Sequence, residues 1–124
     1  MMVPYCGVRR IISGGQSGAD TGALQAARQL GLETGGFAPK GYRTEGGLRP
    51  ELREWGLVEL ESRSYANRTR ANVAAADAVL IFSVIKDSPG TKMTVAEAIS
   101  QNKLWLLVDP CDADAVHRSR EFLV

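Results

Sequence analysis

A short strand, a glycine-rich turn and a helix are predicted in succession by Val8-Arg9-Arg10-Ile11-Ile12-Ser13-Gly14-Gly15-Gln16-Ser17-Gly18-Ala19-Asp20 and the residues after it. The apolar pair Ile11-Ile12 indicates a strand that stops at the first glycines. From Ala19 onward the pattern changes to helical spacing, marked by Ala23, Ala26, Ala27 and Leu30. Gly31 then provides a typical helix end.

The same alternation continues to the end of the chain. Residues 32–38 predict a weaker strand broken by Gly35-Gly36, and residues 40–56 predict a long loop with one helical turn near 51–55. Further strands are expected at 57–60, 78–84 and 104–108, and further helices at 65–76, after Gly90 and after Asp112. Residues 78–84 and 104–108 are almost entirely apolar, so we expect central strands of a parallel sheet, buried on both faces. The sequence therefore predicts one α/β domain over residues 1–124, with a mostly parallel central sheet flanked by helices.

Composition excludes several classes of function. The 124 residues carry 15 basic and 14 acidic side chains, a net charge of +1, which gives no general attraction to nucleic acid or to a membrane surface. No apolar run approaches the ~20 residues that span a bilayer. One histidine and two distant cysteines, Cys6 and Cys111, give no metal-site spacing and no disulfide framework, although one bridge between them stays an alternative. We expect a cytoplasmic protein with no metal site and no nucleic-acid or membrane partner.

The turn after the first strand is the sharpest candidate site. Ligands of open parallel sheets bind beyond the carboxyl ends of the strands, and a glycine-rich turn into a helix favours an anion there. Three glycines in five residues exceed what a tight turn needs, although geometry alone is the alternative explanation. The sequence therefore predicts phosphate contacts from Gly14, Gly15, Gln16, Ser17 and Gly18. The order G-G-x-x-G does not match the dinucleotide fingerprint, and no lysine follows as in a nucleotide triphosphatase loop.

Other polar residues are predicted to lie near the same crevice. Asp20 would repel a phosphate, so one hypothesis is that its carboxylate accepts a hydrogen bond from a ligand hydroxyl or ring N–H, or binds a cation. The alternative is that it only interacts favourably with the helix dipole. A second strand-to-helix turn offers Gly90, Thr91 and Thr94, whose threonines alternatively cap the helix. Arg68 and Asn72 are four residues apart and share a helix face, which suits anion binding or, more commonly, a solvated surface.

Five segments resemble, in the same order, motifs of the molybdenum cofactor carrier family. They are residues 12–20, residues 36–47, residues 65–69 with Asn72-Val73, residues 77–82, and Gly90-Thr91 with Thr94. The resemblance implies a Rossmann-like three-layer sandwich, similar to the lonely-guy phosphoribohydrolases and the DNA-processing DprA proteins. It also implies a small phosphorylated ligand that is nucleotide-like or pterin-like, with the molybdenum cofactor as one candidate. Molybdenum in that cofactor is held by the pterin's dithiolene, so the family needs no metal ligands from the protein.

The sequence also departs from the family at three points. Pro89 stands where a second glycine is expected, and Glu97 is shifted by one residue from the acid of the related hydrolases. Family members usually continue past the last helix, whereas this sequence ends at Val124. The resemblance thus implies that one wall of the site is missing or comes from a partner subunit, and we expect a homo-oligomer, most simply a dimer.

These features favour a non-catalytic binding or carrier protein. In this hypothesis Lys40, Arg43 or Arg68 complements the ligand's charge, and Asp20 and Asn72 orient its organic part. One alternative is a nucleotide N-glycosidic hydrolase that uses Glu97 or Asp20 as its acid. Another is a sensor of a nucleotide derivative.

Overall fold

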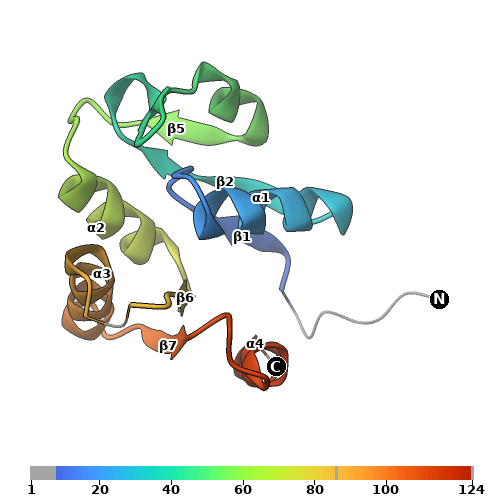
Figure 1. Ribbon diagram of the computed structural model, residues 1–124. Coiled ribbons are helices and arrows are strands. Elements are labelled where there is room, and N and C mark those ends of the chain that lie inside the picture. The colour runs from blue at the N-terminus through green and yellow to red at the C-terminus, as the bar shows by residue number, and fades with distance from the viewer. Residues whose placement is uncertain (1–7, 86, 124) are drawn as a thin grey trace. The chain divides into compact units, whose positions relative to one another are not determined.

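Parallel strands joined by helices make up both units of the chain in the computed structural model, which describes residues 8–85 and 87–123 (Figure 1). One unit is Arg9–Ala75, and the other consists mainly of Ala76–Val124. The predicted α/β class, with parallel sheets flanked by helices, is confirmed.

The unit Arg9–Ala75 contains a three-stranded parallel sheet in the order β1-β2-β5. These strands are β1 (Arg10–Ile12), β2 (Glu33–Ala38) and β5 (Leu57–Glu59). Helix α1 (Ala19–Gln29) packs on β1 and β2, and α2 (Tyr65–Ala75) packs on β2. The predicted strand–turn–helix at the start of the chain is confirmed, and its turn lies at the carboxyl end of β1.

The long loop expected between β2 and β5 contains short ordered elements. They are η1 (Lys40–Tyr42), the hairpin of β3 (Arg43–Thr44) and β4 (Gly47–Leu48), and η2 (Pro50–Trp55). The helical turn predicted near 51–55 is confirmed by η2. Tyr42 and Leu52 are buried, so this segment contributes to the core rather than only covering it.

The core of this unit lies beneath the candidate site. It is formed by Leu24, Ala38, Tyr42, Leu52 and Leu57, with Trp55 packed against it. The helical stripe predicted for α1 is partly wrong, because Ala27 is buried but Leu30 is 47% exposed. Leu24 is fully buried instead, since its larger apolar surface gains more from burial than the alanines that marked the stripe.

Strand β2 is continuous through Gly35-Gly36, which corrects the predicted break. Close neighbours on both glycines explain their presence within a strand. A β-carbon on Gly35 would collide with the guanidinium of Arg10, and one on Gly36 would collide with the backbone carbonyl of Ser13. Here glycine therefore indicates close packing and not a turn.

The unit Ala76–Val124 contains β6 (Ala78–Phe82) and β7 (Leu104–Val108), paired in parallel. Helix α3 (Pro89–Ser100) packs on both strands, and α4 (Ala115–Leu123) packs on β7. The expected burial on both faces is wrong, because Leu104 is 73% exposed. Within the described part of the chain these two strands pair only with each other, and part of their apolar surface stays exposed beside α3 and α4.

Candidate functional site

The turn between β1 and α1 is closed by hydrogen bonds from Ser13 and Gln16. The Ser13 hydroxyl accepts from the N–H of Gly15 at 3.2 Å and donates to the carbonyl of Asp20 at 3.0 Å. The Gln16 carbonyl accepts from the N–H and the hydroxyl of Thr21, at 3.1 and 2.7 Å. These bonds fix the backbone at the strand end, where ligands of open parallel sheets bind.

Each of the turn's three glycines has a reason within the fold. A β-carbon on Gly14 would collide with the side chain of Arg68, and one on Gly15 would lie 2.5 Å from Cδ1 of Leu52. Gly15 and Gly18 have φ of +75° and +79°, a conformation that favours glycine. The number of glycines is thus accounted for by packing and backbone geometry, and support for an anion site has to come from charges and hydrogen-bonding groups.

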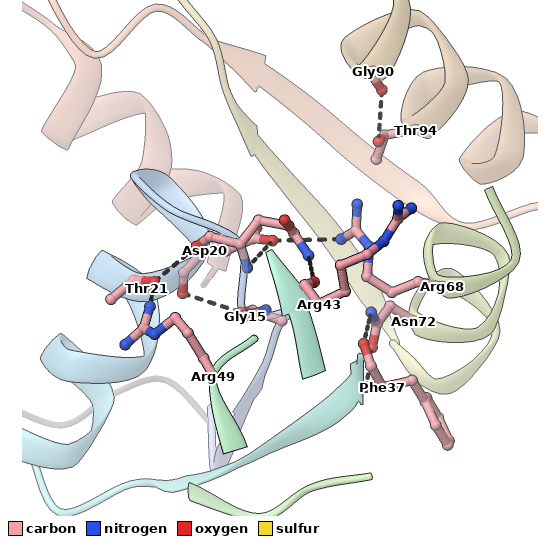
Figure 2. Close-up of polar contacts among 12 residues, drawn as sticks. Gly15, Asp20, Thr21, Phe37, Arg43, Arg49, Arg68, Asn72, Gly90 and Thr94 are labelled. Atoms are coloured by element: carbon pink, nitrogen blue, oxygen red, sulfur yellow. Dashed lines mark hydrogen bonds and ion pairs between the residues drawn. The ribbon is translucent and has the colours of Figure 1, made fainter. Parts of the chain in front are cut away.

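The carboxylate of Asp20 lies against the backbone of this turn (Figure 2). Its Oδ2 atom accepts from the N–H of Gln16 at 3.2 Å and lies 3.4 Å from Nη1 of Arg68. Burial raises the pKa of Asp20 above its ordinary value, although Arg68 and the backbone N–H groups of Gln16 and Gly14 act in the opposite direction. Asp20 therefore interacts with specific groups and not only with the helix dipole.

Arg43 is held next to the same turn by contacts that leave its charge uncompensated. Nε2 of Gln16 donates to the Arg43 carbonyl at 2.9 Å. The Arg43 guanidinium stacks on the ring of Tyr65, 4.3 Å from its centroid, and donates to the carbonyl of Arg63 at 2.7 Å. No carboxylate within residues 8–85 and 87–123 pairs with it, so this guanidinium remains able to attract an anion.

Three buried polar atoms of this cluster have no hydrogen-bond partner among the described residues. They are Oε1 of Gln16, Nε of Arg43 and Nε of Arg68. Buried polar atoms are almost always hydrogen-bonded, to protein, ordered water or a ligand. One acceptor and two donors are thus available to a bound molecule within a single group of side chains.

Lys40, Ser17 and Asn72 take other positions in the unit. Lys40 and Ser17 are exposed. The amide of Asn72 accepts from the Phe37 N–H at 2.8 Å and donates to the Phe37 carbonyl at 2.9 Å (Figure 2). Arg68 and Asn72 do come from the same helix, as the sequence predicts, but Arg68 reaches Asp20 and Asn72 reaches the backbone of β2.

The second predicted turn lies in the unit Ala76–Val124, at the start of α3. A β-carbon on Gly90 would meet no atom within 4 Å. Thr91 is buried, accepts from the Ser88 hydroxyl and donates to the Ser83 hydroxyl, at 2.8 and 3.0 Å. Thr94 donates to the Gly90 carbonyl at 3.0 Å. Both threonines therefore make bonds inside their own unit, and a role for this turn in ligand binding stays a prediction.

Other features of the described chain lie away from these two turns. The unit Arg9–Ala75 has two shallow hollows, of about 420 and 480 Å³. The first is lined by α2 and by residues 60–62 before it, and the second mainly by the amino end of the sheet and the end of η2. No group of three metal-binding side chains and no helix suited to crossing a bilayer occurs among the described residues. Cys111 is an exposed free thiol, and the alternative bridge involves Cys6, outside the described residues.

Sequence reasoning missed three participants in the site: Ser13, Arg63 and Tyr65. A serine directly before two glycines at a strand end is a local signal for a hydroxyl that closes the turn. The stacking of Arg43 on Tyr65 has no such signal, because the two residues are far apart in sequence and meet only through the fold.

The chain is similar to a known protein family and to a solved structure. Residues 11–124 match the model of the circularly permuted YpsA SLOG family. A solved structure from Syntrophus aciditrophicus SB, named "Putative molybdenum carrier protein", is 38% identical, with a TM-score of 0.77. The match covers 82% of this chain and 63% of that one, so the chain spans less than two thirds of that relative.

No curated protein matches the chain significantly. The family match extends over nearly the whole sequence, and the similar structure confirms the resemblance to the molybdenum carrier group and its fold. The chain therefore belongs to the circularly permuted YpsA SLOG family.

Proposed function

We propose that the unit Arg9–Ala75 binds a small phosphorylated ligand, a nucleotide-like or pterin-like cofactor, and that the protein carries this ligand without changing it. The observation that carries the proposal is the group of three unpartnered buried atoms on Gln16, Arg43 and Arg68. Family membership and the name of the similar structure support a ligand-binding carrier role.

Arg43 is the proposed phosphate-binding residue. Its guanidinium is oriented by Tyr65 and by the carbonyl of Arg63, and its charge has no carboxylate partner among the described residues. A guanidinium held in place loses little further entropy when it binds an oxyanion. Arg68 offers a second donor through its unpartnered Nε, although Asp20 already balances part of its charge.

Two acceptors of the same cluster suit the organic part of the ligand. Oε1 of Gln16 has no donor, and the Asp20 carboxylate can accept hydrogen bonds in addition to those from the turn. Pterin and guanine rings carry N–H donors next to one another, so they complement such acceptors. The molybdenum cofactor combines a pterin with a phosphate monoester, and these residues fit both parts without providing a metal ligand.

The remaining predicted residues complete the proposal. Ser17, Gly18 and Lys40 are exposed in the unit Arg9–Ala75, and Gly90, Thr91 and Thr94 belong to the other turn. We expect the exposed residues to contact the phosphate, and Gly90 to allow a ligand to approach the backbone because its β-carbon position is open. A cytoplasmic homo-oligomer remains the expected state.

Hydrolysis of a nucleotide N-glycosidic bond is a second candidate, favoured by Asp20. Its carboxyl has a raised pKa through burial, a property that general acids share. Incubation with nucleoside monophosphates, followed by chromatography for free base, tests this candidate. Release of base that is lost in Asp20→Asn would favour the hydrolase over the carrier.

Calorimetric titration with GMP and with guanosine tests the proposed phosphate contact. Arg43→Gln should weaken GMP binding at least about tenfold, the effect of losing one charge-assisted contact, and should leave guanosine binding nearly unchanged. Arg53→Gln is a matched control, because Arg53 is exposed on η2 and its side chain has no recorded partner among the described residues. Equal GMP affinities in wild type and Arg43→Gln would contradict the proposal.

A further inference from the structure

An anion is already present at the turn between β1 and α1. The N–H of Gln16 donates to the Asp20 carboxylate at 3.2 Å, and Arg68 forms an ion pair with it at 3.4 Å (Figure 2). Backbone N–H groups at such a turn are the groups that commonly bind a free phosphate or sulfate. In this chain a side chain takes that position.

We propose that Asp20 is the specificity-determining residue of the site, because its carboxylate fills the anion position of the turn and excludes free inorganic oxyanions. A ligand is retained only when its phosphate reaches Arg43 and its organic part donates an N–H or O–H to Asp20. The inference rests on the proposed function and narrows it to phosphorylated ligands that also carry a hydrogen-bond donor.

Charge is the physical basis of this exclusion. A dianion placed at the turn would meet the Asp20 carboxylate within a few ångströms, where repulsion between charges in a partly buried site is strong. Arg68 attracts the dianion only weakly, because the Asp20 carboxylate already neutralises part of its charge. Arg49, bonded to the neighbouring Thr21, is itself balanced by Glu51 at 3.0 Å. A donor on the ligand converts the repulsive carboxylate into a favourable partner.

The test uses sodium sulfate as the probe, titrated calorimetrically into the full chain at constant ionic strength. Sulfate carries no hydrogen-bond donor and keeps its double charge between roughly pH 4 and pH 8. Asp20→Asn keeps the size of the side chain, and Asp20→Ala empties the position. Glu54→Gln is the matched control, since it also removes one carboxylate from the unit Arg9–Ala75, but on the exposed surface of η2.

Both Asp20 variants should bind sulfate at least about tenfold more tightly than wild type at neutral pH, and Glu54→Gln should not. In wild type, sulfate binding should strengthen as the pH falls and Asp20 takes up a proton, and this dependence should be absent from Asp20→Asn. Sulfate should also shift the amide resonances of Gly14 and Gln16 in Asp20→Asn.

Unchanged sulfate affinity in both Asp20 variants, an equal gain in Glu54→Gln, or a gain without shifts at Gly14 and Gln16 would overturn the inference. These outcomes are separate from the GMP titration, because sulfate does not require the organic acceptors of the site. If Arg43→Gln leaves GMP binding unchanged while the Asp20 variants still bind sulfate more tightly, only the proposed function is refuted. The reverse pattern would refute only the exclusion by Asp20.

Discussion

The side chain of Arg68 crosses Gly14 in the space that a β-carbon on Gly14 would occupy. This contact brings the guanidinium from α2 to the turn before α1, where it pairs with Asp20. In the sequence Gly14 is typical of a flexible turn, but in the fold its missing side chain provides the space that the charged side chain of Arg68 occupies.

Gly14→Ala should therefore move Arg68 while leaving the fold intact. The colliding atoms belong to a flexible side chain, so the expected loss of unfolding free energy is only about 1 kcal/mol. The ion pair with Asp20 should break, and the pKa of Asp20 should rise further because a lowering influence is lost. Chemical denaturation and NMR titration of the carboxyl measure the two effects.

Gly22→Ala is the control for this change. Gly22 lies within α1, and a β-carbon there would meet nothing within 4 Å. We expect a gain of about 0.5–1 kcal/mol from helix propensity and an unchanged Asp20 titration. The same titration curve in Gly14→Ala as in wild type would show that Arg68 does not depend on Gly14.

Gly36→Ala should be far more damaging. Its β-carbon would collide with the backbone of Ser13, which cannot rotate away, and its φ is +126°. We expect a loss of about 3 kcal/mol or more, measured by denaturation, with little folded protein recovered. A cost similar to that of Gly14→Ala would contradict the close approach of β2 to the turn.

Asn72→Ala should loosen the carboxyl end of β2. Two hydrogen bonds to the backbone of Phe37 are lost, at about 1 kcal/mol each. Hydrogen exchange at the Phe37 amide should accelerate accordingly. Asn67→Ala removes an exposed amide of the same helix and should cost less than about 0.5 kcal/mol. Unaltered exchange at Phe37 in Asn72→Ala would rule out this bracing role.

Asp20→Asn should change how stability depends on pH. Because the folded-state pKa of Asp20 is raised above 3.8, the folded chain binds its proton more tightly than the unfolded chain. Wild type should therefore lose stability relative to Asp20→Asn as the pH rises from about 3.8 through the folded pKa. Urea denaturation over this range measures the difference. A constant difference would mean that Arg68 and the backbone donors balance burial, and a difference of opposite sign would mean that they outweigh it.

The order of strands and helices could be predicted because each has its own periodicity and its own end signals. Local spacing also predicted the turn that contains Gly14–Gly18 and the placement of Arg68 and Asn72 on one helix. It could not show that Gly35 and Gly36 remain in a strand, because their reason is contact with Arg10 and Ser13. Nor could it reveal that Asp20 accepts a hydrogen bond from the Gln16 N–H of the turn. An acidic residue in the first turn of a helix gives the same sequence pattern whether its side chain faces solvent or the backbone.

Native mass spectrometry of the gently purified full chain, followed by denaturation and identification of the released molecule, tests the central claim most directly. We predict a phosphorylated, heterocycle-containing ligand, a molybdopterin mass or a nucleotide. It should be retained by wild type and Arg53→Gln and lost from Arg43→Gln. An empty wild-type protein, a released molecule without phosphate, or equal retention by Arg43→Gln would contradict a phosphorylated cargo held at this site.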